Sequence, residues 1–289
     1  MENQPVFTKR DLFEAVKPFY LFSGLMMYIL GIGLLTYFNI AISWQISIAG
    51  YLIVLFCQLI EGVGTLALRK KAGPPSRPVR AAGNLLWITI AILMLGIAVI
   101  LVFLLLNRNL SVGTWISIAL LFLITIFSTQ EKFTVVNEIF GAVVIAGIIP
   151  ALSFSLFSTE LHSFLILINL PLFFIFLATT IALSFPNYAR DLSLTRNSFL
   201  TVVGWQNGVT LHDLLLIAGF LCLGISGLIG LPWVILWSTM LSGIFAIFQI
   251  VVLHRIAGGH KPNWRLLKFT AIGVFLLSAY TMMLSLLIN

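Results

Sequence analysis

Two polar stripes interrupt the apolar stretches of this sequence, and each contains a carboxylate next to basic residues. The first consists of Gln58, Glu61 and Thr65, whose spacing of three and four residues places them on one helix face. Arg69 follows one turn later and begins a basic cluster. Carboxylates hold Mg²⁺ while arginine and lysine hold phosphate oxygens, so this combination suits a polyphosphate. The alternative is a polar seam that joins two helices by hydrogen bonds.

The second stripe follows the sixth apolar stretch of the chain. Asn187, Asp191 and Thr195 are spaced four residues apart, and Arg190 and Arg196 lie beside them. An ordinary charged helix end with an Arg–Asp pair at the membrane interface is one interpretation. The other is a second half of the same polyphosphate site, and the presence of two such stripes favours it.

These stripes lie in a chain whose composition is typical of a membrane protein. Of its 289 residues, 60% are hydrophobic and 9% are charged, and the mean hydropathy is +1.11. Ordinary soluble domains have about 25% charged residues, so a soluble globular protein, a nucleic-acid-binding domain and a disordered chain are excluded. The two cysteines, Cys57 and Cys222, lie in apolar stretches and predict neither a disulfide nor a zinc site.

Nine apolar stretches are long enough to cross a bilayer, which takes about 20 residues each. We therefore expect an all-α, polytopic membrane protein with nine transmembrane helices and a single transmembrane domain over residues 1–289. The expected spans are residues 18–39, 45–68, 84–106, 111–130, 136–157, 162–185, 211–230, 232–253 and 266–288.

The basic residues predict the orientation of these helices. With nine spans, fifteen of the 16 lysines and arginines fall on one side, and only Arg108 falls on the other. The positive-inside rule then predicts a cytoplasmic N-terminus and an external C-terminus. We expect a multi-pass protein of a bacterial-type inner membrane. The longer connections, 69–83 and 186–210, lie on the cytoplasmic side, where we expect the function to reside.

Ionisable residues at membrane depth are functional candidates, because a charge there is costly to bury. Glu61 and Glu138 meet this description near the ends of the second and fifth spans. His212 and Asp213 have a different interpretation, because they follow Thr210 at the expected start of the seventh span. There we expect them to cap the helix and to interact with its dipole.

Three further segments have a recognisable pattern. Residues 15–21 are AVKPFYL, residues 132–141 contain Lys132 and end in Glu138-Ile-Phe-Gly141, and residues 187–204 contain NYARD followed by TVVG. Together with the nine-span layout, these segments resemble the UbiA superfamily of intramembrane prenyltransferases, and most of all its menaquinone-type branch. The first aspartate motif of that family would fall on residues 57–65.

The resemblance implies a nine-helix UbiA-like bundle that binds Mg²⁺ and a prenyl diphosphate at its cytoplasmic mouth. Glu61 and Asp191 would be the catalytic carboxylates. The implied metal ligands are Glu61, Asp191, Gln58, Thr65 and Thr195, and the implied diphosphate ligands are Lys132, Arg190, Arg196, Arg69 and Asn187. The sequence departs from the family pattern here, because Gln58, Glu61, Thr65 and Thr195 stand where the family has aspartates.

Three hypotheses remain open on the sequence. The first is an active prenyltransferase with a reduced metal site, which moves a prenyl group from a prenyl diphosphate to an aromatic or quinone-precursor acceptor. The second is a catalytically inactive homologue that binds an isoprenoid or quinone, or that serves as a subunit of a membrane complex. The third is a transporter or channel, which the crowding of charges at the cytoplasmic helix ends disfavours. Membrane lipid is a partner in every case, and nucleic acid in none.

Overall fold

The structure is a computed structural model that describes residues 16–288 apart from 73–76, 108–109, 131–134, 161 and 194–197. It describes the backbone, but not the side chains, of residues 69–72 and 77–82. The described residues form helices and no strands, and nine of the helical spans are long and apolar enough to cross a membrane. The protein is therefore an all-α, multi-pass membrane protein, as the sequence predicts.

The helices are numbered in chain order, and two of the described spans change helix type along their length. The bounds are α2 Pro18–Tyr37, α3 Trp44–Ala72, α4 Arg77–Asn107, α5 Val112–Thr129, α6 Asn137–Ala142, η2 Val143–Ile148, α7 Ile149–Ser155, α8 Ser163–Ser184, η3 Phe185–Asn187, α9 Tyr188–Ser193, α10 Phe199–Val203, α11 Trp205–Ile229, α12 Trp233–Ala257 and α13 Trp264–Ile288.

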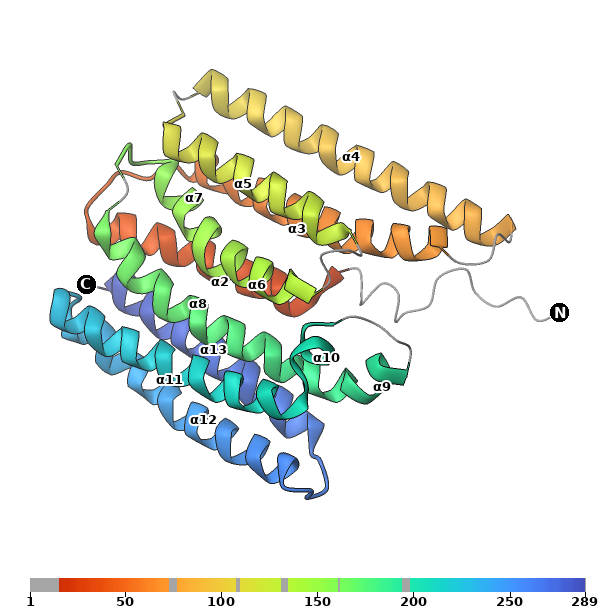
Figure 1. The fold of residues 1–289 in the computed structure, drawn as a ribbon. Helices are drawn as coiled ribbons and strands as arrows, with labels where there is room; N and C mark the ends of the chain where they lie inside the picture. Colours follow the sequence, from red (N-terminus) through yellow and green to blue (C-terminus); the bar gives the residue numbers. More distant parts are fainter. Residues whose placement is uncertain are drawn as a thin grey trace.

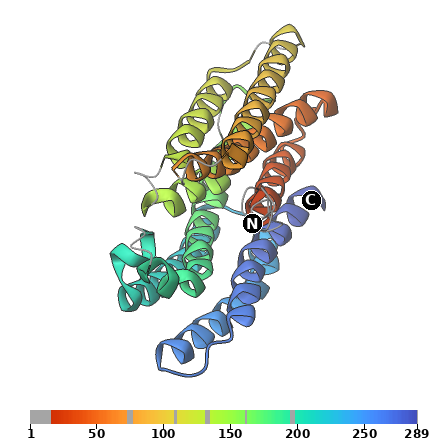
Figure 2. The same cartoon turned by 90° about the vertical axis from the view of Figure 1, so that its right-hand side faces the viewer.

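The long helices run side by side along one axis (Figure 1), and buried residues from α2 to α13 form a continuous apolar core. Turned by 90°, the bundle shows α3 to α5 at one end and α11 and α12 at the other, with α2, α8 and α13 between them (Figure 2). Helix α4 lies at one edge, packs mainly on α3 and is the least buried span. Helix α12 lies at the other edge and packs mainly on α13.

Two prolines interrupt helical hydrogen bonding, and at one of them a neighbouring hydroxyl compensates. Pro171 lies inside α8 and has no N–H for the carbonyl of Leu167. Ser226 of α11 donates its hydroxyl to that carbonyl at 2.8 Å, which satisfies it inside the bilayer. Pro150 likewise cannot bond the carbonyl four residues before it, and the π-helix η2 lies immediately upstream.

The structure corrects three boundaries predicted from the sequence. The connection 69–83 is mostly helical, because α3 continues to Ala72 and α4 begins at Arg77. The connection 186–210 contains η3, α9 and α10, and α11 begins at Trp205, six residues before the predicted start at 211. These segments are polar helix ends that extend beyond the apolar stretch, so hydropathy carries no signal for them.

Candidate functional site

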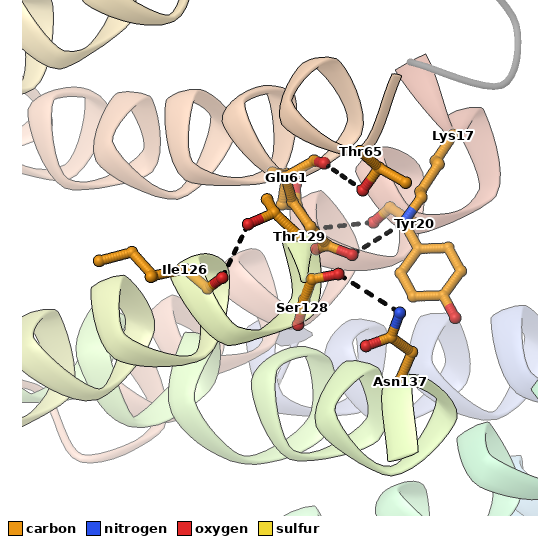
Figure 3. Close-up of polar contacts among 9 residues, drawn as sticks. Lys17, Tyr20, Glu61, Thr65, Ile126, Ser128, Thr129 and Asn137 are labelled. Atoms are coloured by element: carbon orange, nitrogen blue, oxygen red, sulfur yellow. Dashed lines mark hydrogen bonds and ion pairs between the residues drawn. The ribbon is translucent and has the colours of Figure 1, made fainter. Parts of the chain in front are cut away.

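A polar cavity of about 180 Å³ lies at the end of the bundle where α2 and α6 begin and α8 ends. A smaller space of about 10 Å³ shares three of its lining residues and extends toward Gln58. Figure 3 shows this region, with side chains from α2, α3, α5 and α6 pointing toward one another. The larger cavity is lined by Lys17, Tyr20, Glu61, Asn137, Glu138, Thr180, Leu183 and Ser184.

Lys17 and Glu61 form an ion pair in the wall of this cavity. The Nζ atom of Lys17 lies 2.7 Å from Oε1 of Glu61, and it lies 5.5 Å from the ring centroid of Tyr20. Lys17 immediately precedes α2 with φ at 43°, a left-handed conformation that costs a residue with a side chain about 1–2 kcal/mol. Such strain persists only where surrounding contacts stabilise it, and the ion pair to α3 is one of them.

Two glycines let the walls of the cavity approach closely. Gln58 of α3 donates from Nε2 to the backbone carbonyl of Tyr20 at 3.1 Å, and a Cβ at Gly24 would collide with its amide. A Cβ at Gly141 would lie 2.8 Å from the Tyr20 ring. Glycine at both positions therefore lets Tyr20 sit between α3 and α6.

Three buried oxygen atoms at this site have no hydrogen-bond donor among the described residues: Gln58 Oε1, Asn137 Oδ1 and Glu138 Oε2. The other side-chain atoms of the last two residues do have partners. Asn137 donates from Nδ2 to the carbonyl of Ser128 at 3.3 Å, and Ser184 Oγ lies 3.4 Å from Glu138 Oε1. Unpaired buried oxygens are costly, so they mark a place for a hydrogen-bond donor or a hard cation.

The structure brings some of the sequence-predicted site residues together and leaves others apart. Gln58 and Glu61 face the same small space, as their spacing predicts. The Thr65 hydroxyl is used within its own helix, because it donates to the carbonyl of Glu61 at 2.8 Å. Asp191 is half-buried in α9 and does not line the cavity, although its charge acts on Glu138.

The other predicted ligands lie at the same end of the bundle or outside the described residues. Asn187 and Arg190 are exposed on η3 and α9. Lys132, Thr195 and Arg196 lie outside the described residues, and only the backbone of Arg69 is described. Within the described residues, no group of three or more His, Cys, Asp or Glu side chains could hold a metal ion.

Sequence reasoning placed several cavity residues outside its predicted site, namely Lys17, Tyr20, Asn137, Glu138, Thr180 and Ser184. Glu138 carries a signal of its own, because it is an ionisable residue within a span. Lys17 and Tyr20 lie in the segment AVKPFYL, whose pattern does not indicate a role at the site, and the remaining polar residues carry no signal of their own. Their convergence depends on how four helices pack.

A second polar cluster joins α11 to α12, and here the capping prediction for His212 and Asp213 is wrong. Because α11 begins at Trp205, both residues lie inside the helix. Asp213 accepts hydrogen bonds from His212 Nδ1 at 2.8 Å and from His254 Nε2 at 2.6 Å. His212 Nε2 also lies 2.8 Å from Nε2 of the buried Gln249, so a hydrogen-bonded chain runs from the surface into the core.

This cluster predicts unequal effects of its two histidines on stability. His212→Ala is expected to lower the free energy of unfolding by about 1–2 kcal/mol, because it leaves the Gln249 amide buried without a partner. His254→Ala is expected to lower it by less than about 1 kcal/mol, because that side chain is 60% exposed. Thermal unfolding of the detergent-solubilised variants measures both. Equal losses of stability would contradict the buried position of His212 and the exposed position of His254.

Comparison with known proteins assigns this chain to no family. No protein-family model matches it, and no curated protein matches it. The functional conclusion therefore depends on the geometry of the cavity and on the resemblance of its segments.

Proposed function

We propose that the protein is a UbiA-like intramembrane prenyltransferase with a reduced metal site. It would move a prenyl group from a prenyl diphosphate to an aromatic or quinone-precursor acceptor. The observation that carries the proposal is the cavity, where one cation, two carboxylates and a phenol meet at the end of an apolar bundle. A diphosphate needs such a polar mouth, and its isoprenoid tail needs an adjacent apolar interior.

The oxygen atoms of the cavity fit Mg²⁺, the metal that the resemblance implies. Glu61 and the unpaired Glu138 Oε2 and Asn137 Oδ1 are hard oxygen donors, and Mg²⁺ needs only one or two protein carboxylates besides phosphate and water. When bound, Mg²⁺ supplies Lewis-acid stabilisation of the charge on the leaving diphosphate. Lys17 would hold phosphate oxygens, and Asp191 would add negative charge beside the metal.

Aromatic side chains pack against Tyr20, the aromatic residue that lines the cavity. The Tyr20 ring centroid lies 5.6 Å from that of Phe176, which lies 4.8 Å from Phe275 and 5.6 Å from Phe19. Aromatic faces attract cations, and buried aromatic walls exclude water. These rings are therefore suited to protect an allylic cation formed as diphosphate leaves.

A second candidate function is an isoprenoid-binding protein without catalysis, such as a subunit of a membrane complex. The specific observation in its favour is the Lys17–Glu61 ion pair, which occupies the carboxylate that the family would use for metal. The separation of Asp191 from the cavity lining also favours it. In this case the site would hold the head of an isoprenoid or quinone.

A turnover assay on protein in lipid nanodiscs separates these candidates. The reaction would contain Mg²⁺, a panel of prenyl diphosphates and a mixture of aromatic acceptors, with products identified by mass spectrometry. Prenylated product that requires Mg²⁺ supports the transferase. An isoprenoid or quinone that co-purifies with the protein, with no product from any pair of substrates, would instead support the binding protein.

A further inference from the structure

The cavity is lined by a cationic side chain, that of Lys17, whose ion-pair partner Glu61 lines the same cavity. The Lys17 and Glu61 side chains are 31% and 21% exposed, so both can be reached from the cavity that they line. An ammonium group has three N–H donors. Among the described residues, Glu61 Oε1 is the one acceptor within hydrogen-bond distance of Lys17. The remaining donors can therefore bind an incoming acceptor.

The ion pair also joins two helices, α2 and α3, that each pack mainly on other neighbours. Helix α2 packs mainly on α13 and α7 and has few contacts with α3. At the cavity end, the contacts that tie α2 to α3 are the Lys17–Glu61 pair and the hydrogen bond from Gln58 to the Tyr20 carbonyl. Farther along the same two helices, Tyr28 donates to the Ser47 carbonyl at 2.7 Å and its ring lies 5.5 Å from that of Tyr51, so α2 and α3 stay joined when the ion pair opens.

We infer that Lys17 is the anion-binding group of this cavity and that Glu61 is its built-in competitor, so that a phosphate-class anion binds by displacing Glu61 from Lys17. The ion pair and its exposure are independent of any reaction, whereas the choice of a diphosphate as the anion rests on the proposed function. A diphosphate carries more charge and more acceptor oxygens than one carboxylate, so it can replace Glu61 as the partner of Lys17.

Displacement has a second consequence, because it releases a carboxylate into a cavity with two unpaired oxygens. Glu61 would then be free to join Asn137 Oδ1 and Glu138 Oε2 as a ligand of a divalent cation. In the closed pair, the ammonium group of Lys17 opposes a cation at this place. Anion and cation binding are thereby coupled, and the coupling must be reciprocal.

Calorimetric titration with inorganic diphosphate in the presence of EDTA tests the competition without any metal or turnover. The protein is held in phosphatidylcholine nanodiscs, so that no anionic lipid competes for its basic residues. Glu61→Gln is expected to bind diphosphate about fivefold more tightly than the wild type, because it removes the competitor. Lys17→Met is expected to lose saturable binding, alone or combined with Glu61→Gln.

Glu138→Gln is the matched control, because it changes a second carboxyl group of the same cavity and leaves the Lys17–Glu61 pair in place. Its gain in affinity is expected to be less than half of that of Glu61→Gln. Equal gains would mean that general charge, not competition for Lys17, sets the affinity, and would overturn the inference. Saturable binding by Lys17→Met, or weaker binding by Glu61→Gln, would also overturn it.

Thermal unfolding of each variant confirms that it is folded before binding is compared. The experiment also separates this inference from the proposed function. Competition between Glu61 and diphosphate in EDTA, without turnover in the nanodisc assay, would support the inference and favour the non-catalytic binding protein. Turnover without competition between Glu61 and diphosphate would support the transferase and overturn the inference about Lys17.

Discussion

Asp191→Asn is expected to reduce prenyl transfer about 100-fold or more in the nanodisc assay. Asparagine has the same shape as aspartate, so the substitution removes a charge and leaves the packing of α9 unchanged. The Asp191 charge acts on Glu138, which lines the cavity. In the proposed transferase, both carboxylates contribute to the field around a metal-bound diphosphate, and loss of one such electrostatic group typically lowers turnover by about 10²–10³.

Glu160→Gln is the matched control for this prediction, because Glu160 is exposed in the turn between α7 and α8 at the opposite end of the bundle. Its turnover is expected to equal that of the wild type. If Asp191→Asn retained turnover while Glu138→Gln lost it, the residues that line the cavity would form the metal site without any contribution from Asp191. Retention of turnover by both variants would exclude Asp191 and Glu138 from the proposed chemistry and leave Glu61 as its one carboxylate.

The fold could be predicted because the bilayer imposes strong constraints on sequence. An apolar stretch of about 20 residues has few alternatives to a transmembrane helix, so all nine spans are found where they were expected. Prediction was wrong where helices leave the apolar region. The segment 205–210 contains Gln206 and Asn207 within the first turns of α11, and their polarity gave the appearance of a loop.

A site residue could be predicted from the sequence only where its own type and its neighbours in sequence marked it as unusual. Glu61 and Glu138 could be singled out because each is a carboxylate in an apolar span. The partner of Glu61 could not be deduced, because Lys17 is 44 residues away in sequence and reaches it only through the packing of α2 beside α3. The capping error at His212 follows from the misplaced start of α11, and its partner Gln249 could not be deduced because it lies 37 residues away on α12.

The packing of α2 determines the position of Lys17 and Tyr20, and one glycine makes that packing possible. Helix α2 packs on α7, and a Cβ at Gly31 would lie 2.6 Å from the backbone carbonyl oxygen of Pro150 and would also overlap the Ser153 hydroxyl. A backbone atom cannot rotate away as a side chain can. Gly31→Ala is therefore expected to lower the free energy of unfolding by about 3 kcal/mol, the upper part of the range for overpacked cores.

Thermal unfolding in detergent measures this loss, and Gly224→Ala is its matched control. Gly224 lies inside α11 and has no atom within 4 Å of an added Cβ, so alanine there is expected to leave stability unchanged or to raise it slightly. Adding Ser153→Ala to Gly31→Ala is expected to restore only a minor part of the loss, because the Pro150 carbonyl remains in place. Full restoration would mean that the hydroxyl alone limits the approach of α2 to α7. Equal stability of Gly31→Ala and Gly224→Ala would contradict the close packing that holds Lys17 at the cavity.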